Sequence, residues 1–341
     1  MRVPACLFMV ILLMAACGDR ATKPVKAAAP AAMAGVSQWF DAWNLVCRDK
    51  LGVDSLAAPR IFLYDDTAWY TTGDSRPGDT AMAIGGPGFS WAALHWWIAK
   101  HQGQLRIPDG QTIPVGLMSF AGADSAGHPF FVMAVPGYWK QAGVESKTLG
   151  IDNLVTAVFL HEFAHTRQQT GMGAAVTAIE KEHSFGGVPL SDDIVQDLFK
   201  GDSTYHRQWR AEADKFYEAA FATDTPAMKR LTREALTLLQ RRQATWFTGD
   251  RAILQRLDDI FLTMEGLGQY TGFYWLQHPS GGKFDYATSV DGMRRKRNQW
   301  SQEEGLALFL ILDKLSSPGW TAQLLSDHPP TIITLLTAAS Q

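Results

Sequence analysis

The chain has 341 residues, of which 46% are hydrophobic and 19% are charged, and its formal net charge is −3. This composition is typical of a globular protein with enough apolar residues for a full core. The charge is spread along the chain without a basic excess, so we exclude a nucleic-acid-binding function. The short basic run at residues 294–297 is expected to be a solvated loop, because short charge clusters usually face water.

The first sixteen residues have the pattern of a signal peptide. Arg2 gives a positive start, residues 7–14 form an apolar run too short to span a bilayer, and small residues precede Cys17. This segment resembles the bacterial lipoprotein signal, in which cleavage occurs just before a cysteine that then carries the lipid. The resemblance implies a lipid anchor at Cys17 and a location in the bacterial cell envelope, facing the periplasm or the exterior. An ordinary secretory signal cleaved nearby is the alternative.

The rest of the chain divides into a tether and one domain. Residues 17–36 are small and punctuated by proline, which predicts a flexible tether, and the domain is expected at 37–341. A helix is predicted at 37–50. Between about 58 and 140, short β-branched and aromatic runs alternate with Gly, Pro and Asp clusters, which predicts a small sheet with a helix at 90–102 among its strands.

After residue 150 the pattern is almost entirely helical. The element order therefore predicts an α+β fold, with a small mixed sheet in the N-terminal half and a mostly helical C-terminal half. We divide the domain into a helix-plus-sheet part, 37–150, and a helical part, 151–341.

The sequence HEFAH at 161–165 lies on a predicted helix at the junction of these two parts. Asp152 is suited to begin this helix and Gly171 to end it. His161 and His165 are one turn apart and continue the apolar stripe, so both imidazoles can reach one metal ion. Glu162 is turned about 100° around the axis and can accept a proton from a metal-bound water. The motif predicts a catalytic Zn²⁺ site.

A catalytic zinc needs a third protein ligand and an open fourth position. Glu265 ends an apolar stripe on a predicted helix, where an unpaired carboxylate would be unfavourable and a metal would neutralise it. Gly266 and Gly268 allow another backbone to approach closely. Gln269, one turn after Glu265, can orient a ligand histidine. The alternative ligands, nearer in sequence but in a predicted loop, are Glu180, Glu182 and His183.

HEFAH followed far downstream by EGLGQY at 265–270 resembles the gluzincin zinc metallopeptidases, especially bacterial members with a similar second helix. In that family two histidines and a distal glutamate bind zinc, and the glutamate inside the first motif is the general base. The resemblance assigns these roles to His161, His165, Glu265 and Glu162, and its overall layout extends over roughly residues 58–315.

The family also places a strand before the motif helix, where an extended peptide adds to the edge of the sheet. Residues 128–139 occupy that position in this sequence, although an internal strand is equally compatible with them. A further group usually stabilises the oxyanion, and the nearby candidates are Tyr270, Tyr274, His278 and Tyr286.

These features favour a membrane-anchored zinc peptidase that cleaves peptide or protein substrates. The alternatives are a zinc hydrolase acting on a non-peptide amide and a non-catalytic envelope lipoprotein that keeps the metal for stability. Glu162 counts against the last of these, because a structural zinc site closes its fourth position with another ligand. The sequence does not indicate a cleavage preference or a protein partner.

Overall fold

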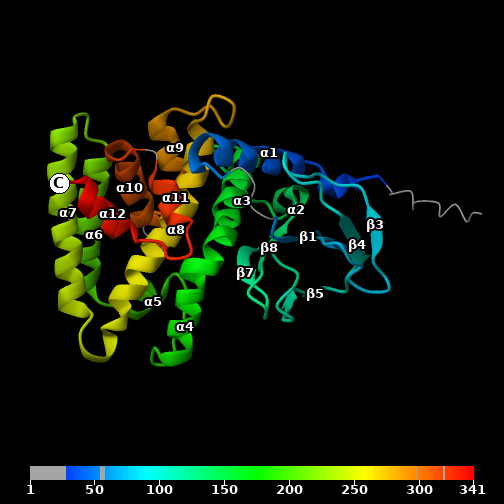
Figure 1. The fold of residues 1–341 in the computed structure, drawn as a ribbon, viewed down its shortest axis with the longest axis horizontal. Helices are drawn as coiled ribbons and strands as arrows, with labels where there is room; N and C mark the ends of the chain where they lie inside the picture. Colours follow the sequence, from blue (N-terminus) through cyan, green and yellow to red (C-terminus); the bar gives the residue numbers. More distant parts are fainter. Residues whose placement is uncertain (1–27, 54–57, 297, 318) are drawn as a thin grey trace, which may run out of the picture.

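The computed structural model describes residues 28–53, 58–296, 298–317 and 319–341 (Figure 1). The predicted signal peptide, Cys17 and the first part of the tether lie outside these residues. The strands are β1 (Arg60–Tyr64), β2 (Ala68–Thr72), β3 (Met82–Ile84), β4 (Trp96–Lys100), β5 (Gln104–Arg106), β6 (Thr112–Pro114), β7 (Ser119–Ala123) and β8 (Pro129–Ala134). The helices are α1 (Val36–Val46), α2 (Pro136–Gln141), α3 (Ile151–Gln168), α4 (Ala174–Glu182), α5 (Ile194–Phe199), α6 (Ser203–Ala220), α7 (Thr225–Trp246), α8 (Ile253–Gln277), α9 (Tyr286–Met293), α10 (Trp300–Leu315), α11 (Trp320–Leu324) and α12 (Ile332–Ala339).

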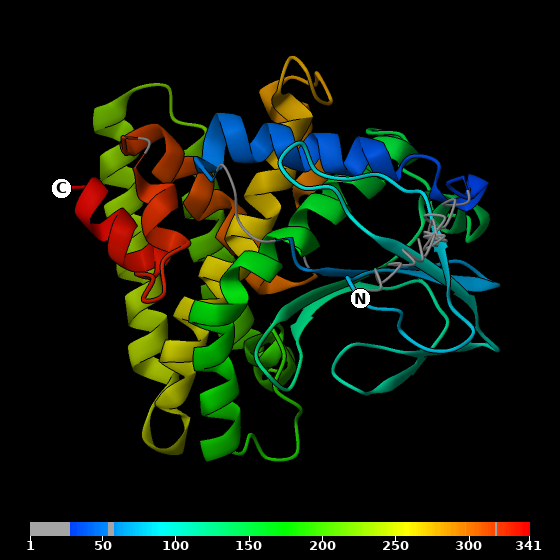
Figure 2. The same ribbon diagram turned by 45° about the vertical axis from the view of Figure 1, so that its right-hand side comes forward.

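The fold is α+β, as predicted, with the sheet in the N-terminal half and helices in the C-terminal half. Six strands form a mixed sheet in the order β3-β4-β2-β1-β8-β7, and β5 pairs with β6 separately. Only the β1–β8 pairing is parallel among the described strands. Figures 1 and 2 show α3 between the sheet and the helices α6, α7, α8 and α10. The motif helix therefore lies at the junction of the two halves.

The prediction of a helix at 90–102 is wrong, because residues 96–100 form β4, an internal strand next to the edge strand β3. Trp96, Trp97 and Ile98 pair with β2 on one side and with β3 on the other. Aromatic and β-branched side chains fit a pleated surface well, and the sheet supplies partners on both edges. Tertiary pairing thus overrides the helical spacing of the apolar residues in this segment.

The expected tether also ends earlier than residue 36. A 3₁₀ turn at Ala31–Met33 precedes α1, and Met33 is buried in the main core. Gly35 adopts a positive φ of 89° at the start of α1. The folded domain therefore begins near residue 31.

The boundaries of the motif helix differ from those expected. Gly150 precedes α3, so Asp152 lies in its first turn and does not cap it. At the other end, a π-helical turn at Gln169–Gly173 leads directly into α4. A Cβ on Gly171 would lie 3.1 Å from the Pro329 side chain, so this glycine permits close packing instead of ending the helix.

Aromatic packing fixes α3 against the sheet. The rings of Phe159 and Phe163 are 5.1 Å apart on one face of α3, and the ring of Phe131 on β8 meets both of them edge-on. Trp43 of α1 also meets Phe163 edge-on at 5.0 Å. These fully buried rings hold the helix that carries the two histidines in one orientation.

The helix α8 packs between α3 and α10, and two of its glycines make this possible. A Cβ on Gly266 would lie 2.7 Å from the carbonyl oxygen of Gly305 on α10. A Cβ on Gly268 would lie 2.6 Å from Nδ1 of His161 on α3. Within the described ranges, no helix is both long and apolar enough to cross a bilayer.

Candidate metal centre

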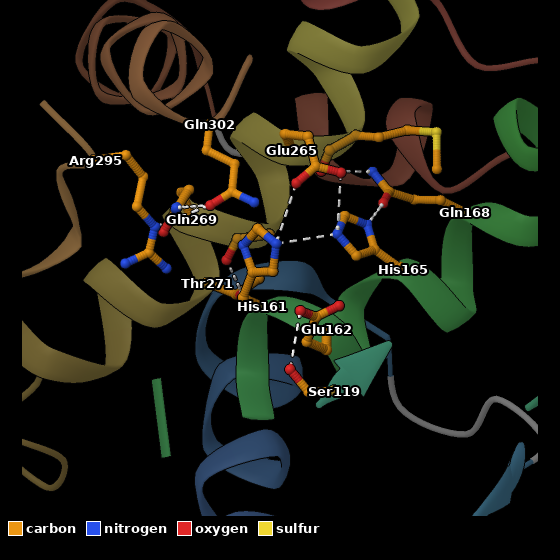
Figure 3. A network of polar contacts seen from close by, with 12 residues as sticks. Ser119, His161, Glu162, His165, Gln168, Glu265, Gln269, Thr271, Arg295 and Gln302 are labelled. Atoms are coloured by element: carbon orange, nitrogen blue, oxygen red, sulfur yellow. Dashed lines mark hydrogen bonds and ion pairs between the residues drawn. The ribbon is translucent and has the colours of Figure 1, made fainter. Parts of the chain in front are cut away.

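His161, His165 and Glu265 form one buried cluster (Figure 3). Nε2 of His161 lies 3.2 Å from Nε2 of His165. The two Glu265 carboxylate oxygens are 3.2 Å and 3.3 Å from these nitrogens. Two imidazole nitrogens and one carboxylate therefore converge on a common point. This donor set fits zinc, whose catalytic sites typically have three protein ligands of these types.

The structure thus brings Glu265 to the two histidines, and it leaves the alternative ligands elsewhere. Glu180, Glu182 and His183 are exposed at the end of α4. Gly268 explains how Glu265 reaches the cluster, since α8 approaches α3 closely only where a side chain is missing. Thr271 lies three residues after Gly268 on α8. Its hydroxyl donates a hydrogen bond to the Leu160 carbonyl of α3 at 3.2 Å, which connects the two helices beside His161.

Glu162 lies next to the cluster without joining it. Its Oε1 accepts a hydrogen bond from the Ser119 hydroxyl at 3.1 Å, and Ser119 begins β7. Burial raises the pKa of Glu162 to about 7. A carboxylate with such a pKa is suited to accept and release a proton near neutral pH. Sequence analysis missed Ser119, because nothing in its local pattern indicates a contact with the motif helix.

The metal-free cluster carries opposite charges at close range. Burial lowers the pKa of His161 to about 4. Burial also acts to lower the pKa of His165, but the Glu265 carboxylate outweighs it and raises that pKa to about 10. The pKa of Glu265 is lowered despite its burial, chiefly by the positive charge of His165. A proton on His165 therefore balances the charge of Glu265 when no metal is bound.

Zinc binding should release at least one proton per chain near pH 7.5, because a ligand histidine must be neutral. His165 has a raised pKa and holds its proton below about pH 10, so zinc must displace that proton. The apparent zinc affinity should then rise by at least about tenfold per pH unit across neutrality. Calorimetric titration in two buffers with different protonation enthalpies measures the number of protons. Zinc binding without proton release would contradict this charge assignment.

Gln168 orients one ligand. Its Oε1 accepts a hydrogen bond from Nδ1 of His165 at 2.8 Å, and its Nε2 donates to the Met264 carbonyl at 3.4 Å. With Nδ1 protonated in this way, Nε2 is the nitrogen of His165 that could bind a metal ion. The helical spacing of three residues between His165 and Gln168 could have indicated this contact from the sequence.

Gln269 does not have the role expected for it. Its Nε2 donates to Oε1 of Gln302 on α10 at 2.7 Å, and its own Oε1 is buried without a partner in the described part of the chain. Nδ1 of His161 is likewise buried and unpartnered among the described residues. Gln269 therefore connects α8 to α10 instead of orienting a histidine.

The tyrosines proposed for the oxyanion lie away from the cluster. Tyr270 is fully buried against Phe309 and Trp320. The Tyr274 hydroxyl donates to the Asp49 carbonyl at 3.4 Å, on the other side of α8. The two remaining candidates also contact other regions: His278 pairs with Asp49, and Tyr286 donates to the Ala220 carbonyl.

Residues 128–139, considered as an edge strand, do not form the edge of the sheet, which is the neighbouring strand β7. Residues 129–134 form β8, which pairs with β1 on one side and with β7 on the other. Pro136 begins α2. The strand at the end of the sheet order is β7, and it packs against α3 beside Glu162. The internal position of residues 129–134 explains their nearly complete burial.

Comparisons of the chain with protein-family models, with curated proteins and with solved structures found no match. The resemblance to gluzincins therefore rests on the residues of the two motifs.

Proposed function

We propose that this protein is a zinc-dependent peptidase. The observation that carries the proposal is the convergence of His161, His165 and Glu265, with Glu162 beside them and outside the cluster. A structural zinc site would need a fourth closing ligand, and among the described residues the cluster contains three. The open position and the nearby carboxylate favour hydrolysis.

His161, His165 and Glu265 would hold the zinc ion, which would lower the pKa of water at the site to about 7 and polarise the substrate carbonyl. Glu162 would accept a proton from the attacking water and pass it to the leaving nitrogen. Ser119 would keep the Glu162 carboxylate turned toward the site through its hydrogen bond. Enclosure of the three ligands keeps bulk water from competing with these contacts.

Strand β7 would bind the substrate backbone. It is the last strand in the sheet order, so its outer edge has backbone groups that the sheet does not pair. An extended peptide can add to such an edge by main-chain hydrogen bonds. Because Ser119 of β7 also contacts Glu162, a peptide on this edge would pass the general base.

The test is a zinc assay combined with a hydrolysis assay on the purified protein. It should contain close to one zinc per chain and cleave a casein or mixed-peptide pool. A chelator should abolish cleavage, and added zinc should restore it. Full zinc occupancy without cleavage of any peptide would reject the peptidase proposal and favour the non-peptide or non-catalytic alternatives.

We further propose that Cys17 carries a lipid that anchors the protein to a membrane of the cell envelope. The support is the signal-like sequence before Cys17. The mature protein should fractionate with membranes, and Cys17→Ser should release it or block its processing. An unchanged membrane fraction and electrophoretic mobility of the variant would reject the anchor.

A further inference from the structure

Arg295 is a charged residue near the cluster that the proposed mechanism does not use. It lies in the loop between α9 and α10, within the basic run that was expected to be solvated, and it is half-buried. Its Nε donates to Oε1 of Gln302 at 2.9 Å, and the same oxygen accepts from Gln269. Because Gln269 is one turn after Glu265 on α8, this chain of contacts fixes Arg295 relative to the metal ligands (Figure 3).

The loop itself is anchored by Glu303. The buried Glu303 carboxylate accepts the backbone N–H groups of Arg295 and Lys296 at 2.8 Å and 2.7 Å. It also pairs with the Arg294 guanidinium, which lies 3.8 Å from the centre of the Tyr217 ring. The neighbouring arginines thus differ: Arg294 pairs with Glu303 and packs on Tyr217, whereas Arg295 contacts Gln302 beside the cluster. The expectation of a solvated loop is wrong for both.

The guanidinium of Arg295 has unused hydrogen-bond donors. Only its Nε has an acceptor among the described residues, which leaves Nη1 and Nη2 without a protein partner there. No ion pair joins it to a described carboxylate. An arginine stays charged at neutral pH, and a half-buried guanidinium with a free fork of donors is suited to a planar anion.

The position of Arg295 indicates which anion it would meet. In Figure 3 the His161 ring stands between Arg295 and His165, so the guanidinium is separated from the point where the two Nε2 atoms converge. A substrate group bound by the Arg295 guanidinium would therefore not be the reacting carbonyl, but a part of the substrate further along. A carboxylate matches the charge and the fork of donors.

We propose that Arg295 binds a substrate carboxylate, so that the site prefers peptides with a carboxylate close to the scissile bond. This inference rests on the proposed peptidase function. The carboxylate could be the C-terminus of the peptide or an acidic side chain, and both present the same planar anion. Gln302 is a positioning residue, because it holds Nε and leaves the other two nitrogens to the ligand.

The test measures binding as well as cleavage. The probes are N-acetyl-dialanine, its C-terminal amide, and an amidated N-acetyl dipeptide that ends in Glu. The proteins are the zinc-loaded parent, Arg295→Met, Arg295→Lys and Gln302→Leu. Lys296→Met is the matched control, because it removes the same charge from the same loop, at a side chain that pairs with Asp291 at the surface. Zinc content and thermal midpoint are recorded for each protein.

The parent should bind a carboxylate-bearing probe about tenfold to a hundredfold more tightly than the neutral amide, as expected for charge-assisted hydrogen bonds. Arg295→Met should remove this preference, Arg295→Lys should retain part of it, and Lys296→Met should keep all of it. Whichever carboxylate probe binds more tightly identifies a C-terminal or a side-chain carboxylate. In cleavage assays the variants should raise KM for the preferred peptide and change kcat much less.

Equal affinity of the parent for all three probes would overturn the proposal, as would a preference that survives Arg295→Met. A loss of kcat that is equal for charged and neutral peptides would also overturn it, since Arg295 would then act on the reacting oxygen. If Arg295→Met does not fold, the test uses Gln302→Leu instead. An undiminished preference of that variant for the carboxylate probes over the neutral amide counts against the proposal. Absence of all cleavage by the parent rejects the peptidase function instead and leaves the binding comparison intact.

Discussion

Glu162→Gln should keep its zinc and lose hydrolysis by a factor of at least about 10², because a positioned general base typically contributes that much. Glutamine preserves the shape of the side chain and can still accept the hydrogen bond from Ser119, but it cannot take up a proton. Glu162 contacts no ligand atom in the cluster, so its replacement should not weaken metal binding. Activity on a peptide pool and zinc content of the purified variant measure the two effects.

Ser119→Ala is the matched comparison for this variant. It removes the hydrogen bond to Glu162 but leaves the carboxylate in place, so activity should fall by no more than about tenfold. Full activity of Glu162→Gln would show that another group activates the water, and the resemblance to gluzincins would then be misleading about mechanism.

His161→Ala and His165→Ala should each abolish stoichiometric zinc binding and, with it, hydrolysis. Each removes one of three converging donor atoms from a buried cluster. Glu265→Gln keeps the shape but removes the charge that neutralises the metal. The zinc affinity of Glu265→Gln should fall by at least about 10-fold to 100-fold. That is the typical effect of removing a residue that only orients a metal ligand. Excess zinc should restore part of its activity.

A metal titration of each variant, followed by thermal unfolding with and without zinc, separates loss of a ligand from loss of the fold. Retention of full zinc by both histidine variants would end the metal assignment. If Glu265→Gln alone binds zinc like the parent, the third ligand lies elsewhere, and Glu180, Glu182 and His183 become the residues to replace.

The site could be predicted from the sequence where one helix determines the geometry. His161 and His165 are one turn apart, so any helix through them aligns their rings, and Glu162 must then point to a different side. The expectation that another backbone approaches Gly266 and Gly268 holds at Gly266, which meets the Gly305 carbonyl, whereas the His161 ring approaches Gly268. Local periodicity is sufficient for such inferences.

Predictions that depended on contacts between distant segments were less successful. Tyr270 follows Glu265 by five residues, which turns it to another side of α8, and the helical repeat alone could have excluded it. Arg295 gave no signal, because its direction is set by Glu303 and Gln302 on the next helix. The helical spacing of apolar residues around 96–100 is misleading, since the strands that pair with this segment lie elsewhere in the chain.

The cluster also has a consequence for the order of events in folding. Gln168 and the Met264 carbonyl that it contacts are 96 positions apart, and the metal ligands on α3 and α8 have a similar separation. Closing so long a loop is entropically unfavourable and comes after local helix formation. Before α8 docks on α3, the two histidines can be aligned on their helix, but the Glu265 carboxylate that completes the three-residue cluster is missing. The proposed activity should therefore arise only at the last stage of folding. If zinc binds the completed cluster, it should slow unfolding more than it speeds folding.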